Sequence, residues 1–229
     1  MAMTYEHRRG EIETYFDRTA LAAWEKLTGT TPVSGIRATV RAGRDAMRAT
    51  LLSWLPANLH GMRLLDAGCG TGALAMAAAA RGAQVVAIDL SPQLVALAAQ
   101  RAGGGEKIRF CAGDMLDESH GRFDYVVCMD SIIHYAPGDA ANALARLAAR
   151  TNHAVLFTFA PFTPLLGTML TVGKMFPRGD KSPAIEPQSE RALRRRLTAP
   201  AFDGFITARS QRIKSGFYFS QAMELKKWG

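Results

Sequence analysis

The chain has 229 residues, of which 48% are hydrophobic and 21% charged, and its formal net charge is +8. This composition is typical of a folded globular chain and excludes the disordered and disulfide-dense classes. The positive charge leaves nucleic acid, anionic lipid and acidic small molecules open as partners.

Residues 1–60 are predicted to form a helical arm or lid ahead of the main domain. Apolar side chains recur at helical spacing over residues 11–27 and again over 36–55, with a turn over 30–34 between the two helices. Pro56 is expected to end the second helix.

Residues 61–159 alternate short apolar runs with helical segments. Ser91 is expected to cap the helix that begins at Pro92. Apolar strands separated by helices predict an α/β fold, in which a parallel sheet has helices on both faces. The predicted strands are 62–66, 84–89, 108–112, 123–129 and 153–159, and the predicted helices are 71–81, 92–101 and 139–149.

The rest of the chain completes a single predicted domain over residues 61–229. Residues 160–187 are rich in Pro, Gly and Thr and are expected to form a small cap inserted over the sheet. A basic helix over 188–197 follows. Alternating polar and apolar residues over 205–213 and 217–225 predict a C-terminal antiparallel hairpin with its turn at 214–216.

Cysteine usage and the N-terminus indicate the compartment. The chain has an odd number of cysteines, Cys69, Cys111 and Cys128, and none of them forms a Cys-x-x-Cys or Cys-x-His pair. We therefore expect free thiols in a reducing cytoplasm and no zinc site. The polar segment 5–13 predicts no secretory leader. Residues 151–173 carry no formal charge, but two prolines interrupt them, so we expect an apolar cap or a membrane-surface contact and no span.

A glycine-rich stretch over residues 64–72 follows the first predicted strand. Gly68, Gly70 and Gly72 allow a sharp turn and a close backbone approach to a ligand at the carboxyl end of a strand. The glycines alone also fit a dinucleotide site. Asp66 favours a sulfonium cofactor, because a carboxylate repels a pyrophosphate and attracts the ammonium group of a methionine moiety.

Two further acids follow later strands. Asp89 can accept hydrogen bonds from both ribose hydroxyls of either cofactor class, so it does not discriminate between them. Asp114 can accept from an adenine amino group, with the backbone amide of Met115 beside it; a loop acid or a helix cap is the structural alternative.

The order and spacing of these motifs over residues 62–159 resemble the class I methyltransferase family. The resemblance implies a Rossmann-like, seven-stranded sheet whose last strand runs antiparallel, and S-adenosylmethionine as cofactor. The residues assigned to the cofactor are Asp66, Gly68, Cys69, Gly70, Gly72, Asp89, Leu90, Asp114, Met115 and Met129.

A closer resemblance begins at residues 15–24, Tyr-Phe-Asp-Arg-Thr-Ala-Leu-Ala-Ala-Trp. They are similar to the N-terminal signature of the magnesium-protoporphyrin IX O-methyltransferases of chlorophyll and bacteriochlorophyll synthesis. Segments 36–37, 41–44, 131–135 and the insertion over 160–182 are similar too, although residues 184–186 lack the expected aromatic continuation. The resemblance implies methylation of one propionate, on ring C, of Mg-protoporphyrin IX. Magnesium then arrives within the substrate, and the protein needs no metal site.

Substrate residues are assigned on this resemblance and on chemistry. His134 and Tyr15 are the candidates for closing the site and orienting the acceptor. The role of His134 stays open among a base, a hydrogen-bond donor, a metal contact and a structural residue. For Tyr15, plain helix packing stays open as the alternative. Arginines at helical spacing can pair with a propionate. The substrate-binding candidates are Arg37, Arg41, Tyr135 and Phe162.

Several alternatives stay open at this point. The acceptor can be another apolar molecule, such as a quinone precursor or a lipid, and the fold can serve as a porphyrin carrier without catalysis. An RNA methyltransferase is disfavoured, because the chain has neither an RNA-binding appendage nor an Asn-Pro-Pro-Tyr-type motif. No nucleic acid partner is expected. The porphyrin-binding subunit of magnesium chelatase and the photosynthetic membrane surface are the further partners considered.

Overall fold

The computed structural model describes residues 5–18, 28, 35–162 and 184–228. Within these residues, seven strands form one sheet in the order β3-β2-β1-β4-β5-β7-β6. Strands β1 to β5 are parallel, whereas β7 is antiparallel to both β5 and β6. The strands are β1 (Arg63–Ala67), β2 (Gln84–Asp89), β3 (Ile108–Ala112), β4 (Phe123–Cys128), β5 (Thr151–Phe159), β6 (Phe205–Ser215) and β7 (Tyr218–Lys227). The predicted α/β architecture is confirmed.

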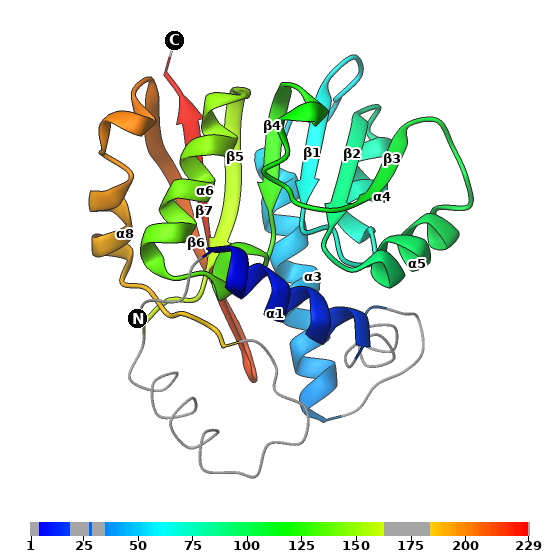
Figure 1. Cartoon of the computed structure of the whole chain (residues 1–229), viewed down its shortest axis with the longest axis horizontal. Coiled ribbons are helices and arrows are strands. Elements are labelled where there is room, and N and C mark those ends of the chain that lie inside the picture. Colours follow the sequence, from blue (N-terminus) through cyan, green and yellow to red (C-terminus); the bar gives the residue numbers. More distant parts are fainter. Residues whose placement is uncertain (1–4, 19–27, 29–34, 163–183, 229) are drawn as a thin grey trace.

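Helices cover the sheet from both sides. One hydrophobic core joins the sheet to α3 and α4, and a second joins its other face to α6 and α8. The helix α1 crosses the lower end of the sheet, where the parallel strands end (Figure 1). The helices are α1 (Tyr5–Arg18), α3 (Ile36–Trp54), α4 (Ala73–Ala80), α5 (Pro92–Ala102), α6 (Pro137–Ala149) and α8 (Glu190–Arg196).

The central strands explain why the sheet is buried on both faces. In β1, Leu64 points into one core and Leu65 into the other, and both side chains are fully buried. Successive strand residues face opposite sides, so a continuous apolar run requires cover on both. The helix α3 supplies part of that cover through Met47 and Leu51, which are also fully buried. The proposed division of residues 1–60 from the domain stays a prediction.

The start of α5 follows the chemistry expected from its sequence. The Ser91 hydroxyl accepts a hydrogen bond from the Leu94 amide at 3.2 Å, and Pro92 occupies the first turn. Such a cap satisfies one of the amides that a helix start leaves without a partner. Because Ser91 lies only two residues after the end of β2, the cap fixes how the chain leaves the carboxyl end of that strand.

Two predicted boundaries are wrong. The first helix begins at Tyr5, six residues before the predicted start at 11. Its first turns lack apolar periodicity, but Tyr5 and Arg9 hydrogen-bond to Asp114 after β3, and these contacts stabilise the helix there. Residues 19–27 and the predicted turn at 30–34 lie outside the described residues. The hairpin turn comprises Gly216 and Phe217, with Ser215 paired to Tyr218. Gly216 adopts a φ of 55°, which suits a two-residue hairpin loop.

The described ends of the predicted cap meet each other. The Phe162 amide donates to the Gln188 carbonyl at 2.9 Å, and the Gln188 amide donates to the Ala160 carbonyl at 2.8 Å. Residues 163–183, which make up most of the predicted insertion, lie outside the described residues. Among the helices that the structure does describe, none has the length and apolar character needed to cross a membrane.

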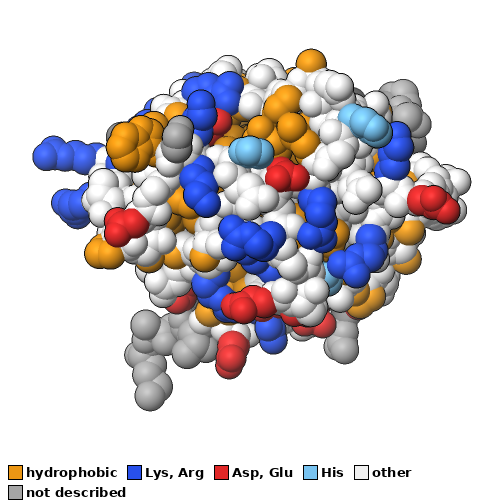
Figure 2. Space-filling view, turned by 90° about the horizontal axis from the view of Figure 1, so that it is seen from above, with side chains coloured by type: hydrophobic (Ala, Val, Ile, Leu, Met, Phe, Trp, Pro, Cys, Tyr) orange, Lys and Arg blue, Asp and Glu red, His pale blue; other side chains and the backbone are white. Residues whose placement is uncertain are grey.

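Basic side chains are spread over the end of the molecule away from α1 (Figure 2). Arg63 at the start of β1 donates to the carbonyls of Arg122 and His120, and Arg150 donates to the carbonyls of Met115 and Asp117. These guanidinium groups tie the connection between β3 and β4 to the amino ends of β1 and β5. Part of the net positive charge therefore has a structural use.

Candidate active site

A cavity of about 350 Å³ opens at the carboxyl ends of β1, β2 and β4. Its walls come from the glycine-rich loop, from the residues that follow β2, β3 and β4, and from α1 and α3. Ligands of open α/β sheets bind at this end of the strands. The fold therefore brings the predicted cofactor motifs into one pocket.

The glycine-rich loop has a backbone that only glycine adopts without strain. Gly68, Gly70 and Gly72 have φ values of 84°, 51° and 78°. A Cβ atom at Gly68 would lie 2.3 Å from the Cβ of Ser131. The amides of Gly68 and Cys69 donate to the Ile88 carbonyl at 2.8 and 2.9 Å, so the loop is held between the end of β2 and the segment after β4.

Asp66 carries the clearest electrostatic signal in the pocket. Its side chain is 1% exposed, and its Oδ2 has no hydrogen-bond partner within the described part of the chain. Burial raises the pKa of Asp66 to about 7. A buried acceptor without a partner is costly, and an ammonium group would satisfy it. Asp66 thus fits the methionine end of the expected cofactor.

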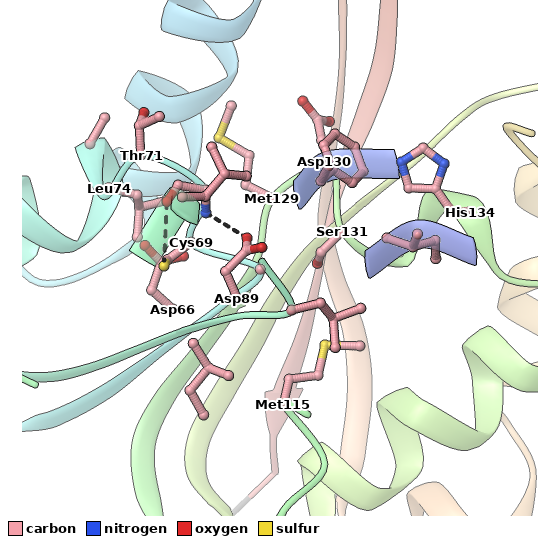
Figure 3. A pocket seen from close by; sticks show the side chains of 18 of the residues that line it. Asp66, Cys69, Thr71, Leu74, Asp89, Met115, Met129, Asp130, Ser131 and His134 are labelled. Atoms are coloured by element: carbon pink, nitrogen blue, oxygen red, sulfur yellow. Dashed lines mark hydrogen bonds between the residues drawn. The ribbon is translucent and has the colours of Figure 1, made fainter. Parts of the chain in front are cut away.

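Asp89 holds the loop from the neighbouring strand (Figure 3). Its Oδ2 accepts from the Gly70 amide at 2.8 Å and its Oδ1 from the Ser91 amide at 3.0 Å. Burial raises its pKa, and these amide hydrogen bonds oppose the rise. Each carboxylate oxygen has a second lone pair, so both can still accept from ribose hydroxyls.

Asp114 faces the N-terminal helix. Its Oδ1 accepts from the Tyr5 hydroxyl at 3.0 Å and from the Leu116 amide at 2.8 Å, and its Oδ2 accepts from Arg9 at 2.9 Å. The Tyr5 ring stacks on Tyr135, with 4.7 Å between centroids. Tyr5 and Arg9 of α1 thus occupy some of the Asp114 lone pairs that were assigned to the adenine amino group. The adenine role of Asp114 stays a prediction.

His134 lies in the short helical turn η2 (Ile132–His134), which follows β4. The imidazole is 7% exposed, and its Nδ1 lies 3.3 Å from the carbonyl oxygen of Ala184. A carbonyl only accepts, so this contact favours the tautomer with the proton on Nδ1. Phe16 of α1 packs edge-on against the ring at 6.0 Å between centroids. The helix α1, the turn η2 and the end of the predicted cap therefore meet at His134.

Three arginines of α3 form the opposite wall. Arg41, Arg44 and Arg48 all line the pocket, and Arg44 pairs with the buried Asp130 at 2.7 Å. Arg48 pairs with Asp45 at 2.9 Å. Residues spaced by three or four positions share one face of a helix. The cavity consequently has an acidic side at the sheet and a basic side at α3.

The structure brings most of the predicted site residues together. Those that line the cavity are Asp66, Gly68, Cys69, Gly70, Asp89, Leu90, Asp114, Met115, Met129, Arg41, His134 and Tyr135. Their placement accords with the predicted roles, which stay predictions for each residue.

Four predicted residues do not line the cavity. Tyr15 packs against Phe16, one position along α1, and it is Phe16 that faces the pocket. A Cβ at Gly72 would meet Ala98 and Phe110, so Gly72 serves the packing of α4. Arg37 and Phe162 are exposed. Their proposed contacts with ligands receive no support from these positions.

The sequence interpretation missed several pocket residues. Tyr5 precedes the apolar periodicity, and no local pattern could relate it to a strand end far along the chain. Arg44 shares the helical spacing of Arg41, which was a usable signal. Asp130 adjoins Met129, but its burial depends on β5 and β7. Within the described residues, no group of His, Cys, Asp and Glu could hold a metal ion.

Known proteins share this arrangement. A family model described as "Magnesium-protoporphyrin IX methyltransferase C-terminus" matches residues 128–227, and one described as "Methyltransferase domain" matches 64–153. The magnesium-protoporphyrin O-methyltransferase of Rhodobacter capsulatus is 44% identical over 99% of this chain and 100% of that protein.

Structural similarity extends just as far. The crystal structure of magnesium protoporphyrin IX methyltransferase from Synechocystis PCC 6803 with bound S-adenosylhomocysteine has a TM-score of 0.83 at 28% identity, over 96% of this chain and 99% of that one. A ubiquinone biosynthesis O-methyltransferase of Alkalilimnicola ehrlichii is 30% identical, but over 62% of this chain and 57% of that protein. The class I methyltransferase fold is confirmed, and the chain belongs to the magnesium-protoporphyrin IX methyltransferase family.

Proposed function

We propose that the protein transfers a methyl group from S-adenosylmethionine to a propionate carboxylate of Mg-protoporphyrin IX, within (bacterio)chlorophyll synthesis. The products are the monomethyl ester and S-adenosylhomocysteine. The observation that carries the proposal is that similarity to the Rhodobacter capsulatus enzyme spans 99% of this chain. It therefore includes α3 and the segment after β4, which shape the pocket beyond the cofactor motifs.

The charge division of the cavity suits this pair of ligands. S-adenosylmethionine, when bound, supplies a methyl group on a sulfonium and leaves as a thioether. Asp66 and Asp89 attract and orient the cationic ligand, whereas Arg41, Arg44 and Arg48 face an anionic one. A carboxylate is ionised at neutral pH, so the residues must align it and exclude water and need not remove a proton.

His134 is expected to orient the acceptor. With Nδ1 donating to the Ala184 carbonyl, Nε2 carries no proton to donate to a carboxylate, so the imidazole would orient the acceptor by packing, with Phe16 edge-on against the ring. Replacing His134 by phenylalanine should lower kcat by about tenfold and leave the dissociation constant of the cofactor within about twofold, since alignment supplies much of such a rate. Steady-state kinetics and calorimetry on one preparation separate the two; normal turnover would make His134 structural.

Methylation of a quinone precursor is the alternative acceptor reading. The ubiquinone relative matches over only 62% of this chain, whereas the Rhodobacter capsulatus enzyme matches over 99%. The uncharged stretch 151–173 suits any flat apolar substrate, so it does not decide between the two.

One assay tests the proposal directly. The protein is incubated with methyl-labelled cofactor and, in parallel, Mg-protoporphyrin IX, metal-free protoporphyrin IX and a demethylated quinone precursor. Label is expected in a monomethyl ester of the magnesium porphyrin. Label in the quinone alone would support the alternative, and porphyrin binding without any ester would identify a carrier.

We also propose that the protein works in the cytoplasm, in peripheral contact with the photosynthetic membrane. Ile36, Phe162 and Phe217 are 58%, 65% and 54% exposed. The Ser215 hydroxyl donates to the Thr39 carbonyl at 2.8 Å, which places the hairpin turn with Phe217 beside the first turns of α3. Exposed apolar side chains near a site for an apolar substrate favour contact with a lipid surface.

Vesicle flotation tests this contact. Phe217→Ser should reduce binding to vesicles of anionic and neutral phospholipid, while Ile206→Ser, which removes a side chain 50% exposed near the start of β6, should not. Equal loss in both variants, or no binding by the natural protein, would contradict the proposed membrane contact.

A further proposed partner is the porphyrin-binding subunit of magnesium chelatase, because direct transfer avoids releasing an apolar porphyrin into water. Faster turnover with subunit-bound porphyrin than with free porphyrin would support this partner.

A further inference from the structure

Asp130 lies two residues after the end of β4 and two before the start of η2, and it is the centre of a buried hydrogen-bond network. Among the described residues it is the only non-glycine residue with a positive φ, at 54°. Its carboxylate is 7% exposed and accepts from Thr158 at 3.0 Å, Ser220 at 3.1 Å, Tyr218 at 3.0 Å and Arg44 at 2.7 Å. A strained backbone conformation persists only where many surrounding contacts hold it in place, and such residues cluster at functional sites.

The donors come from three elements that pack together at the pocket. Thr158 lies in β5, Tyr218 and Ser220 in β7, and Arg44 in α3. Burial raises the pKa of Tyr218, so its hydroxyl stays protonated and donates. The network therefore ties the last parallel strand, the antiparallel strand and the basic helix to one carboxylate.

Gly43 allows α3 to approach this network. A Cβ atom at position 43 would lie 2.5 Å from Cδ1 of Tyr218. Without a side chain there, the helix backbone packs directly on the tyrosine ring, and the next residue, Arg44, reaches Asp130. Both Arg44 and Asp130 line the cavity that also holds Asp66 and His134.

We infer that Arg44 is a carboxylate-binding subsite for the reacting propionate of the substrate, and that Asp130 is a positioning residue that holds its guanidinium and offsets its charge. This inference rests on the proposed function, and it assigns the two residues separate tasks. Arg44 has five N–H donors in a planar fork, of which Asp130 takes at least one, and the fork matches the geometry of a carboxylate.

The offset has a chemical reason. The reacting carboxylate loses its negative charge as it becomes an ester, so a full positive charge beside it stabilises the ground state more than the transition state. An arginine paired with a buried aspartate can still orient the carboxylate by hydrogen bonds while holding less net charge against it. Arg48 has a partner too, but Asp45 is 51% exposed, where solvent screens the pair.

The main test compares two ligands that differ only at the carboxylates. Binding of Mg-protoporphyrin IX and of its dimethyl ester is measured by porphyrin fluorescence, without cofactor. Arg44→Lys keeps a cation beside Asp130 but removes the fork, so the dissociation constant of the dicarboxylate should rise about tenfold, and that of the dimethyl ester should not change. Equal weakening of both ligands would overturn the subsite.

Asp130→Asn tests the second task. It removes the negative charge of Asp130 beside Arg44, so kcat should fall by about tenfold while KM for the porphyrin also falls, a combination that a loosened fold would not give. Glu118→Gln is the control and should alter neither constant by more than about twofold, because Glu118 lies outside the cavity, is 82% exposed in its pair with Arg146, and exposed pairs contribute little. A fall in kcat with a rise in KM would contradict the charge offset. If Asp130→Asn does not fold, as judged by circular dichroism, Arg44→Lys with the two ligands still decides the subsite.

The proposed function and this inference fail in different ways. If the natural protein neither binds nor methylates Mg-protoporphyrin IX, the proposed function is wrong. If it does both, and Arg44→Lys weakens dicarboxylate and dimethyl ester alike, only the inference is wrong.

Discussion

Replacing Asp66 by asparagine is expected to weaken S-adenosylmethionine binding at pH 8 by at least about 100-fold, the loss typical of breaking a buried charge pair. The Asp66 side chain is 1% exposed, and its Oδ2 has no other partner in the described part of the chain. The ammonium group of the ligand would then face a neutral amide at a buried position.

The same residue gives the natural protein a pH dependence. Burial raises the pKa of Asp66 to about 7, so the free protein holds a proton there at pH 6 and has lost it at pH 8. A cationic ligand favours the ionised form, so binding at pH 6 must release that proton. The dissociation constant is therefore expected to rise up to tenfold for each pH unit below about pH 7.

The sign for stability is opposite to that of an ordinary salt-bridged aspartate. The unfolded chain loses this proton near its usual pKa of 3.8, well before the folded protein does. Asp66 therefore lowers the free energy of unfolding as pH rises from about 4 to 7. Asp66→Asn should remove this contribution, so its melting temperature at pH 8 should be no lower than that of the natural protein.

Calorimetry in two buffers with different ionisation heats measures the released proton. About one proton is expected at pH 6 and none at pH 8 for the natural protein, and none at either pH for Asp66→Asn. Asp45→Asn, which changes an exposed acid of the same cavity, should keep the natural pattern. Proton release that persists in Asp66→Asn would show that another group, such as Asp89, is responsible.

Gly68→Ala is expected to abolish measurable cofactor binding and to lower the melting temperature. The added Cβ would lie 2.3 Å from the Cβ of Ser131, and the φ of 84° is one that alanine adopts at a cost of about 1–2 kcal/mol. Relief of the clash must move either the glycine-rich loop or the segment after β4, and both line the pocket.

Gly61→Ala is the matched control for backbone strain. Its φ is 76°, and a Cβ there would meet no atom within 4 Å. It should share only the backbone cost of about 1–2 kcal/mol and leave cofactor affinity unchanged. If Gly68→Ala behaved like Gly61→Ala in both thermal melting and calorimetric titration, the close contact with Ser131 would not control the pocket.

The elements of the central domain were predictable because their signals are local. Ser91, Pro92 and the apolar runs of β2 and β3 follow propensity and periodicity that a short window contains. The start of α1 was not predictable in this way, because its first turn is stabilised by Asp114 and Tyr135, more than a hundred residues away. The turn of the hairpin depended on the register between β6 and β7, which strand pairing decides.

The acidic half of the candidate site was predictable for the same reason. Asp66 and Asp89 follow strands whose carboxyl ends must meet at one edge of a parallel sheet. The basic half was predicted only in outline: Arg41 lines the cavity, but Arg37 is exposed, and Arg44 was not selected. Helical spacing places these arginines on one side of α3, but only the packing of α3 on Tyr218 decides which of them reach the pocket.

Local patterns were enough to predict the α/β class, the cofactor edge of the sheet and the family, because glycines, strand-end acids and apolar periodicity act over a few residues. The tertiary structure alone decided the partners of the charged groups. Asp114 pairs with the arm, and Asp130 pairs with Arg44, since the chain closes these distances only when α1 and α3 pack against the strand ends. Hydrogen bonds and ion pairs depend on separations of a few ångströms, which sequence distance does not encode.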